Sequence, residues 1–216
     1  MLTLSFFRSV RNHPRSADTL WFGDNPKIGL AVRARPPYQF QALPSLPDTP
    51  KYVIPVSVTG PVSFTLFAVW SIQGQEHPYV RAICKAVDLY SHLIRDNPAV
   101  VVGDFNSNAI WDKDHPPEMN HSALVDRLAS LGLVSAYHHV RNEPHGAEKE
   151  PSYYHQWNQQ KPFHIDYCFV PRPWAEKITA VKIGSFEEWR RHSDHRPLLV
   201  DLPDDDRTAS VRIGSV

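Results

Sequence analysis

The chain has 216 residues, which is long enough for one domain with a hydrophobic core. Hydrophobic residues make up 42% of it and charged residues 21%, an ordinary balance for a globular protein. The formal net charge is zero, which argues against a protein that coats nucleic acid but not against a pocket that handles one phosphate. No run is long enough to span a membrane and the start lacks the regions of a signal peptide, so we expect a cytoplasmic protein.

The first third of the chain is predicted to be mainly β-structure. Residues 1–18 show no clear period, and we expect an atypical segment there. Residues 28–33 read as a strand, and residues 62–70 form a stronger strand prediction. Residues 52–58 are also rich in β-formers, although Pro55 favours an edge strand or a bulge there.

The hydrophobic period changes after this β-rich region. Apolar residues recur at steps of three and four from Val80 to Ile94, which predicts an amphipathic helix from about Pro78 to about Asn97. The run at residues 99–103 follows at once. Its continuous β-branched character predicts a strand buried on both faces.

A second helix carries leucines at helical spacing, namely Leu124, Leu128 and Leu131. Ser122 is a plausible N-cap for this helix, and Gly132 fits the position just after its end.

The last third of the chain is predicted to contain three further strands, at residues 165–170, 178–183 and 197–201. From residue 203 to residue 216 the pattern weakens, and we expect a disordered tail. The two cysteines, Cys84 and Cys168, lie on apolar patterns without metal-type spacing, so buried thiols are expected rather than a disulfide.

Three short stretches carry candidate chemistry. Gly103-Asp104-Phe105-Asn106 follows the buried strand, so a carboxylate and a carboxamide come where that strand would end. Taken alone, this tetrapeptide could equally be a strand followed by an Asp/Asn turn. Asp104 could hold a hard cation or take a proton, and Asn106 could form hydrogen bonds without a charge.

The second stretch is His164-Ile165-Asp166-Tyr167, and the third is Ser193-Asp194-His195-Arg196-Pro197. Strand alternation places Asp166 on the face opposite Ile165 and Tyr167. Each stretch has a structural alternative, because Asp166 could pair with an arginine and His195 could be a satisfied core histidine.

The ordered set of stretches resembles the endonuclease/exonuclease/phosphatase superfamily, which has the DNase I-like fold. Further similar segments are residues 28–32, 131–137 and 151–155. The resemblance covers a domain at residues 19–202. It implies the α/β class, with a four-layer sandwich of two mixed sheets flanked by helices.

The resemblance also implies metal-dependent hydrolysis of phosphoester bonds, with Mg²⁺ or Mn²⁺ as the cofactor. Asp104, Asn106, Asp166 and His195 would be the catalytic residues, with Asp166 orienting His195. The metal ligands would be Asp104, Asn106 and Asp194. Substrate contacts are predicted for Asn108, which follows the Asp-x-Asn loop, and for His164, where relatives often carry a basic residue.

The family pattern also has an early strand with an asparagine and another that ends in a metal-binding glutamate. Neither is found before residue 28, so we expect an N-terminally truncated form whose sheet lacks these strands. The predicted function is a nuclease that acts on DNA or RNA, with no membrane and no obligate protein partner. The alternatives are a phosphatase or lipid phosphodiesterase of the same fold, and a catalytically impaired remnant that binds a phosphate or a partner.

Overall fold

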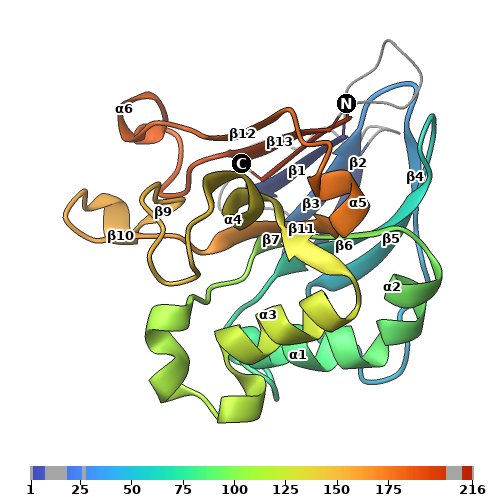
Figure 1. The fold of residues 1–216 in the computed structure, drawn as a ribbon, viewed down its shortest axis with the longest axis horizontal. Coiled ribbons are helices and arrows are strands. Elements are labelled where there is room, and N and C mark those ends of the chain that lie inside the picture. Colours follow the sequence, from blue (N-terminus) through green and yellow to red (C-terminus); the bar gives the residue numbers. More distant parts are fainter. Residues whose placement is uncertain (1, 8–18, 26–27, 203–210, 216) are drawn as a thin grey trace.

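The computed structural model describes residues 2–7, 19–25, 28–202 and 211–215, and a six-stranded mixed sheet lies at its centre (Figure 1). The strand order is β4-β5-β6-β7-β11-β8. Strands β6 and β7 run parallel because helices connect them, and the other neighbours are antiparallel. The bounds of these strands are β4 Gln39–Ala42, β5 Val53–Thr59, β6 Phe64–Trp70, β7 Ala99–Asp104, β8 Leu133–Ser135 and β11 Asp166–Pro171.

A second β layer packs on one face of this central sheet. It consists of two three-stranded antiparallel sheets, β1-β3-β2 and β12-β13-β14, and β1 lies beside β14. Apolar side chains of both layers, such as Leu30, Val102 and Val200, form the core between them. The bounds are β1 Leu2–Phe7, β2 Thr19–Asn25, β3 Ile28–Ala34, β12 Ala180–Ile183, β13 Leu198–Leu202 and β14 Val211–Ser215.

Several strands lie where the sequence predicted none, among them β2, β4 and β8 and the two terminal strands β1 and β14. Strand β1 falls in the segment expected to be atypical, and β14 falls in the tail expected to be disordered. Both are held by pairing with a neighbour, β1 with β3 and β14 with β13, which weak local patterns do not reveal. Strand β3 is therefore paired on both sides, and the expectations for residues 8–18 and 203–210 lie outside the described residues.

Helices cover the other face of the central sheet. The apolar sides of α1 (Val80–Leu89) and α3 (His121–Ser130) pack against outward-facing residues of the strands, including Phe67, Val101 and Phe169. The structure therefore confirms the α/β class, with packed mixed sheets and flanking helices. The remaining elements are α2 Ser91–Asp96, η1 Ala109–Asp114, η2 Pro117–Met119, α4 Ala136–Arg141, β9 Tyr153–Tyr154, η3 His155–Trp157, β10 Pro162–Phe163, α5 Arg172–Ala175 and α6 Phe186–Trp189.

Local details differ from the sequence predictions at the helices. The single helix expected to end near Asn97 is two helices, because Tyr90 ends α1 and begins α2. The N-cap of α3 is Asn120, whose side chain accepts from the amide of Ala123 at 2.8 Å, and not Ser122. The hydroxyl of Ser122 instead donates to Asp112.

Pro55 also differs from its prediction, because β5 lies inside the sheet, between β4 and β6. The β4 pairing ends at Ala42 and Val56, so the missing N–H of Pro55 falls beyond that ladder. Cys84 and Cys168 are buried free thiols as predicted, and burial raises the pKa of each to about 12. In the described part of the chain, no helix has the length and apolar character needed to cross a bilayer.

Candidate active site

The candidate site lies where three strands of the central sheet meet at one edge. Asp104, the last residue of β7, is the direct cross-strand partner of Asp166, the first residue of β11. On the other side of β7, Asp104 is aligned with Trp70 at the end of β6. The strand register therefore brings together two carboxylates that are 62 positions apart in the sequence.

Asn106 holds the carboxylate of Asp104 through both of its oxygens. Its backbone N–H donates to Oδ1 at 2.8 Å, and its Nδ2 donates to Oδ2 at 2.8 Å. The same Nδ2 lies 2.9 Å from the carbonyl oxygen of Ser71. This turn needs a φ of +43° at Asn106, a left-handed conformation that asparagine adopts more readily than most residues.

Asp166 and His195 form the hydrogen-bonded pair that the sequence predicted. The Nδ1 of His195 lies 3.0 Å from Oδ2 of Asp166. The hydroxyl of Ser152 donates to the same Oδ2 at 2.7 Å and accepts from the backbone amides of Ile165 and Asp166 at 3.0 Å each. Ser152 is fully buried and so fixes the carboxylate from behind.

The loop that carries His195 is held by its own contacts. The amide of His195 donates to the hydroxyl of Ser193 at 3.0 Å, and the rings of His195 and Tyr153 lie 4.6 Å apart. The buried Arg196 donates through Nη1 to the carbonyl oxygens of Ser193 and His195, and its guanidinium lies 4.8 Å from the ring of Tyr154. The histidine ring is therefore positioned by backbone bonds as well as by Asp166.

Burial and charge act in opposite directions on the two ionisable groups that face each other across the site. The Nε2 of His195 lies 3.9 Å from Oδ2 of Asp104. Burial, with a further contribution from the Asp166 charge, raises the pKa of Asp104 to about 7 against the opposing effect of His195. Burial alone would lower the pKa of His195, but the carboxylates of Asp166 and Asp104 outweigh it and raise the pKa to about 9. His195 therefore carries the proton at neutral pH.

These groups open into a cavity of about 380 Å³. Asp104, Asn106, Asp194 and His195 provide its polar lining, and Asp194 is itself buried. Asp166 lies behind His195 and is not part of the lining. The rest of the wall is largely apolar and aromatic, with Ile28, Trp70, Ile72, Tyr79 and Tyr153. Polar groups that converge in an otherwise apolar cavity are typical of a ligand site.

The donor set of this cavity fits a hard divalent cation. One ligand atom from each of Asp104, Asp166 and His195 lies within 4.8 Å of the others. Burial, and to a smaller extent the Asp166 charge, raises the pKa of Asp104, and a cation beside these carboxylates would stabilise their charged form. Among the residues that line the cavity in the described chain, the only carboxylates are those of Asp104 and Asp194.

Two predicted substrate-binding residues lie elsewhere. Asn108 is 3% exposed, and its Nδ2 lies 2.9 Å from the carbonyl oxygen of His164 and 3.0 Å from the hydroxyl of Tyr167. His164 is 4% exposed, and its Nδ1 donates to the carbonyl oxygen of Glu150 at 2.8 Å. Both side chains belong to a second, buried polar cluster, in contrast to the prediction that they contact the substrate.

Sequence reasoning missed Ser152 and Tyr153 as parts of the site. They stood out only as part of a segment similar to the family, and their spacing shows no chemical pattern. Their importance comes from a backbone bridge between Tyr153 and His195, which places the segment beside the histidine loop.

Two packed β layers with a histidine–aspartate pair and further carboxylates at the strand ends define a class of hydrolases that act on phosphoesters. Residues 3–195 match the model of the Endonuclease/Exonuclease/phosphatase family, so the chain belongs to that family. A comparison with curated proteins found no significant match.

Solved structures show the same fold. The 3′ phosphatase NExo from Neisseria, bound to product DNA hairpin, has a TM-score of 0.65 and 17% identity over 94% of this chain and 99% of that one. An AP endonuclease from Archaeoglobus fulgidus has a TM-score of 0.63 and 14% identity, over 95% and 99%. The endonuclease domain of TRAS1, a telomere-specific non-LTR retrotransposon, has a TM-score of 0.60 and 11% identity, over 95% and 99%.

Proposed function

We propose that this chain is a divalent-metal-dependent phosphodiester hydrolase that acts on DNA or RNA. The observation that carries the proposal is the position of His195, whose two ring nitrogens lie 3.0 Å from Asp166 and 3.9 Å from Asp104 at the wall of the cavity. An orienting carboxylate, an imidazole and a second carboxylate are what hydrolysis of a phosphoester by an activated water requires.

His195 and Asp104 would have complementary roles. The Nδ1–H of His195 is directed to Asp166, so in the protonated ring Nε2–H is left to donate to a phosphoryl oxygen in the cavity. Asp104 would position the attacking water by accepting a hydrogen bond from it. Asn106 fixes the orientation of Asp104 through its two hydrogen bonds.

Mg²⁺ or Mn²⁺ would be held by Asp104 and Asp194, with Asn106 as the predicted third ligand. Such a cation neutralises charge that develops on the phosphoryl oxygens, and oxygen ligands suit both ions. The buried carboxylates on the cavity wall support this assignment.

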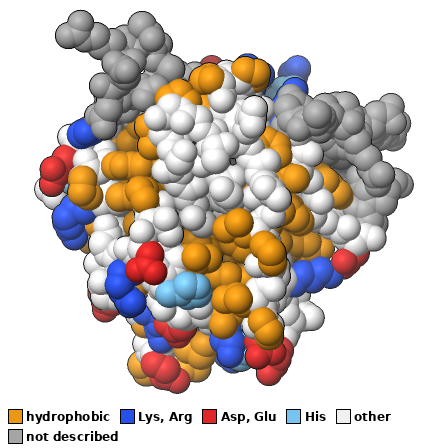
Figure 2. Space-filling view, turned by 90° about the vertical axis from the view of Figure 1, so that its right-hand side faces the viewer, with side chains coloured by type: hydrophobic (Ala, Val, Ile, Leu, Met, Phe, Trp, Pro, Cys, Tyr) orange, Lys and Arg blue, Asp and Glu red, His pale blue; other side chains and the backbone are white. Residues whose placement is uncertain are grey.

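A nucleic acid is the favoured substrate because aromatic side chains lie close to the polar groups. Trp70, Tyr79 and Tyr153 line the same cavity and offer faces on which a base can stack. Figure 2 shows the side of the molecule that carries β4, where basic and acidic side chains are intermingled. The formal net charge of zero supports binding through the cavity and not through an extended basic surface. A cytoplasmic location remains a prediction.

Removal of a terminal phosphate from nucleic acid is the second candidate. The polar groups gather in one cavity of about 380 Å³, and the structurally similar Neisseria protein is named a 3′ phosphatase. The same histidine and carboxylates would serve this reaction, so only the substrate that is hydrolysed distinguishes the two candidate functions.

The test is a cleavage assay with Mg²⁺, with Mn²⁺ and with EDTA. Single-stranded, double-stranded and abasic DNA, RNA and 3′-phosphorylated DNA would be offered to the wild type and to Asp104→Asn. We expect metal-stimulated hydrolysis by the wild type and its loss in Asp104→Asn. The control is Asp114→Asn, which removes an exposed carboxylate of η1. A folded wild type that hydrolyses none of these substrates with either metal would overturn the proposal.

A further inference from the structure

A second cluster of ionisable side chains lies outside the active-site cavity. It contains four histidines and Glu148, packed around the buried Tyr167. The proposed hydrolysis uses none of them. The histidines come from three parts of the chain, and they are His121 at the start of α3, His138 in α4, His145 in the loop after α4 and His164 before β11.

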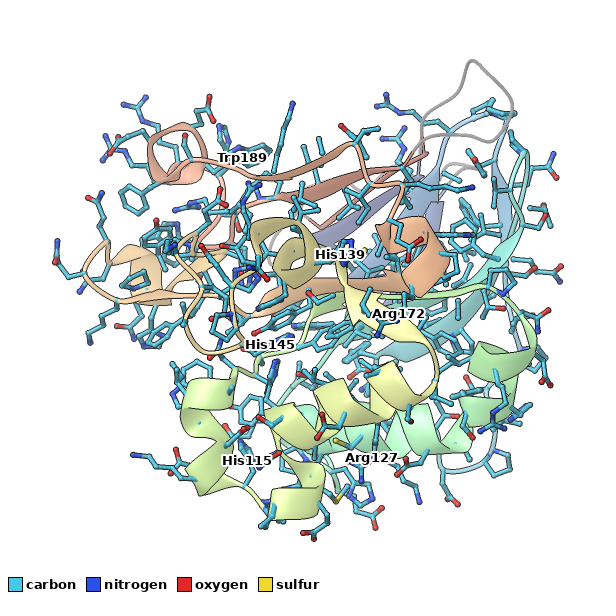
Figure 3. The ribbon with its side chains drawn as sticks, viewed as in Figure 1. His115, Arg127, His139, His145, Arg172 and Trp189 are labelled. Carbon is cyan, nitrogen blue, oxygen red and sulfur yellow. The ribbon has the colours of Figure 1, made fainter. Side chains whose placement is uncertain are left out.

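The ring nitrogens and the carboxylate of this cluster lie close together. The Nε2 of His138 is 3.0 Å from Oε1 of Glu148, and the Nε2 of His121 is 3.0 Å from the Nδ1 of His145. The rings of His138 and His145 are stacked with centroids 3.5 Å apart. One ligand atom from each of His138, His145 and Glu148 lies within 4.8 Å of the others. Figure 3 shows His145 between α4 and α3.

Several acceptors of the cluster share the same few donors. The Nδ2 of Asn108 lies within 3.1 Å of both carboxylate oxygens of Glu148, the carbonyl oxygen of His164 and the hydroxyl of Tyr167. The Glu148 carboxylate also accepts from the amide of Gly146 at 3.1 Å and lies 3.0 Å from the Nε2 of His138. A cation at this carboxylate would take the place of donors that its oxygens now share.

A second observation concerns His164. Its Nδ1 carries the hydrogen that is donated to Glu150, so its Nε2 is an acceptor. Within the described chain this buried Nε2 has no hydrogen-bond partner.

We propose that His138, His145 and Glu148 bind a structural zinc ion, with the fourth position taken by water or by His121. Imidazole nitrogens with one carboxylate are a zinc donor set, and ligands at 2.0–2.2 Å in a tetrahedron lie about 3.3 Å apart. The Nε2 of His138 and the Oε1 of Glu148 lie 3.0 Å apart, close to this separation. The ligand atom of His145 lies within 4.8 Å of both and would move toward them when the ion binds. Zn²⁺ is favoured over Mg²⁺ because two of the three ligands are imidazoles.

The zinc would fasten the loop of residues 142–152 to α4. The same loop provides the carbonyl oxygen of Glu150, which His164 contacts, and Ser152, which holds Asp166 in the active site. This role is separate from the proposed hydrolysis and does not depend on it. It would stabilise the segment that positions the catalytic histidine.

The first test uses the whole wild-type chain, purified without chelator from zinc-supplemented cells. We expect about one zinc ion per chain by elemental analysis after dialysis. We also expect the chelated protein to take up Co²⁺ with the visible absorption of a four-coordinate site, and its melting temperature to fall when the metal is removed. A folded protein that keeps no zinc and shows no such Co²⁺ spectrum would overturn the proposal.

Variants locate the ion. Glu148→Gln and His145→Asn should lose the zinc and the Co²⁺ spectrum. His139→Asn should keep both, because His139 is the exposed neighbour of His138 on α4. Asp104→Asn should also keep both, since it alters only the active-site cavity. Zinc lost from Asp104→Asn but kept by Glu148→Gln would place the ion in the active site and overturn the proposal. If Glu148→Gln and His145→Asn misfold, the Co²⁺ spectrum of the wild type tests the proposal, and its absence would overturn it.

Discussion

The active-site cluster and the buried histidine cluster are built from the same residue types but differ in access and in charge. His195 and Asp104 face a cavity of about 380 Å³, whereas His121 is 1% exposed and His164 is 4% exposed. Both clusters depend on the loop after β7, the first through Asp104 and Asn106 and the second through Asn108. A cluster of polar side chains in this fold does not by itself identify a catalytic site.

The difference in charge explains why the histidines behave differently. Two carboxylates contact the ring of His195, and together they outweigh the cost of burying a charge. In the second cluster, neutral imidazoles are neighbours of one another and Glu148 is the main nearby charge, so burial dominates for His121 and His145. The same residue type therefore has a raised pKa beside carboxylates and a lowered pKa among neutral neighbours.

The largest expected effect is the loss of activity in His195→Ala. If His195 transfers or donates a proton in the reaction, its removal should lower kcat/KM by about 10²–10⁴-fold. The measurement is steady-state hydrolysis of the best substrate found with Mg²⁺ or Mn²⁺. His192→Ala is the matched control, since His192 is exposed in the same loop. Equal kcat/KM values for the two variants would show that His195 does not take part in the reaction.

Ser152→Ala should have the next largest effect, on stability and on catalysis together. It removes the donor to Asp166 and the acceptor of two buried amides, which we expect to cost about 3 kcal/mol in the free energy of unfolding. Because Asp166 would be less well held, kcat should fall more than the affinity for substrate. Urea unfolding and steady-state kinetics measure the two effects.

Ser130→Ala is the control for this variant, because it removes an exposed hydroxyl that donates to a backbone carbonyl oxygen within α3. Ser152→Thr should restore part of the loss, since it keeps the hydroxyl. An unchanged kcat in Ser152→Ala would show that loop 142–152 does not support the active site.

The grouping of Asp104, Asp166 and His195 could be predicted because each residue lies in a short motif directly next to a strand. Asp104 follows a strand that is evident from its β-branched run, and the antiparallel register with Asp166 completes the site. Ser152 could not be predicted in this way. Ser152 acts through its hydrogen bond to Asp166, and that bond forms only when its segment packs against β11 in the folded chain.

Asn108 and His164 were predicted to contact the substrate for the same reason that Asp104 was predicted to be catalytic, namely closeness to a motif. The structure turns them toward Glu148 and Glu150, which lie in a loop without a hydrophobic period. The strands β1 and β14 show the same limit, because each is defined by its partner strand and not by its own pattern. Local motifs therefore predicted which side chains meet at the cavity better than they predicted the partners of neighbouring residues such as Asn108 and His164.

The pH dependence of stability should separate the two clusters in metal-free protein. The pKa of His195 is raised to about 9, so its stabilising effect is complete below its unfolded value near 6.5 and is lost as the pH rises toward 9. The pKa values of His121 and His145 are lowered, so their effect is complete above about pH 6.5 and is lost as the pH falls. Each change should be on the order of 2 kcal/mol.

Urea unfolding between about pH 5 and pH 9 measures how the free energy of unfolding changes with pH on the acid side and on the alkaline side. His195→Gln should weaken the loss of stability on the alkaline side, and His145→Asn should weaken the loss on the acid side. The raised pKa of Asp104 makes stability fall as the pH rises toward 7, and the buried cysteine thiols lower stability above their unfolded pKa. The variants are therefore compared with the wild type at each pH. Variants that flatten the same side would show that the two clusters titrate as one.

The smallest expected effect is that of Asn120→Ala, which removes the side-chain cap of α3. Loss of the bond to Ala123 should lower the free energy of unfolding by about 1 kcal/mol. Because α3 begins with His121, the variant should weaken zinc retention while kcat stays at the wild-type value. Ser122→Ala is the control for the cap, since that hydroxyl donates to Asp112 and not to the helix amides. A fall in kcat for Asn120→Ala would mean that the start of α3 supports the active site as well, and the two clusters would then be one functional unit.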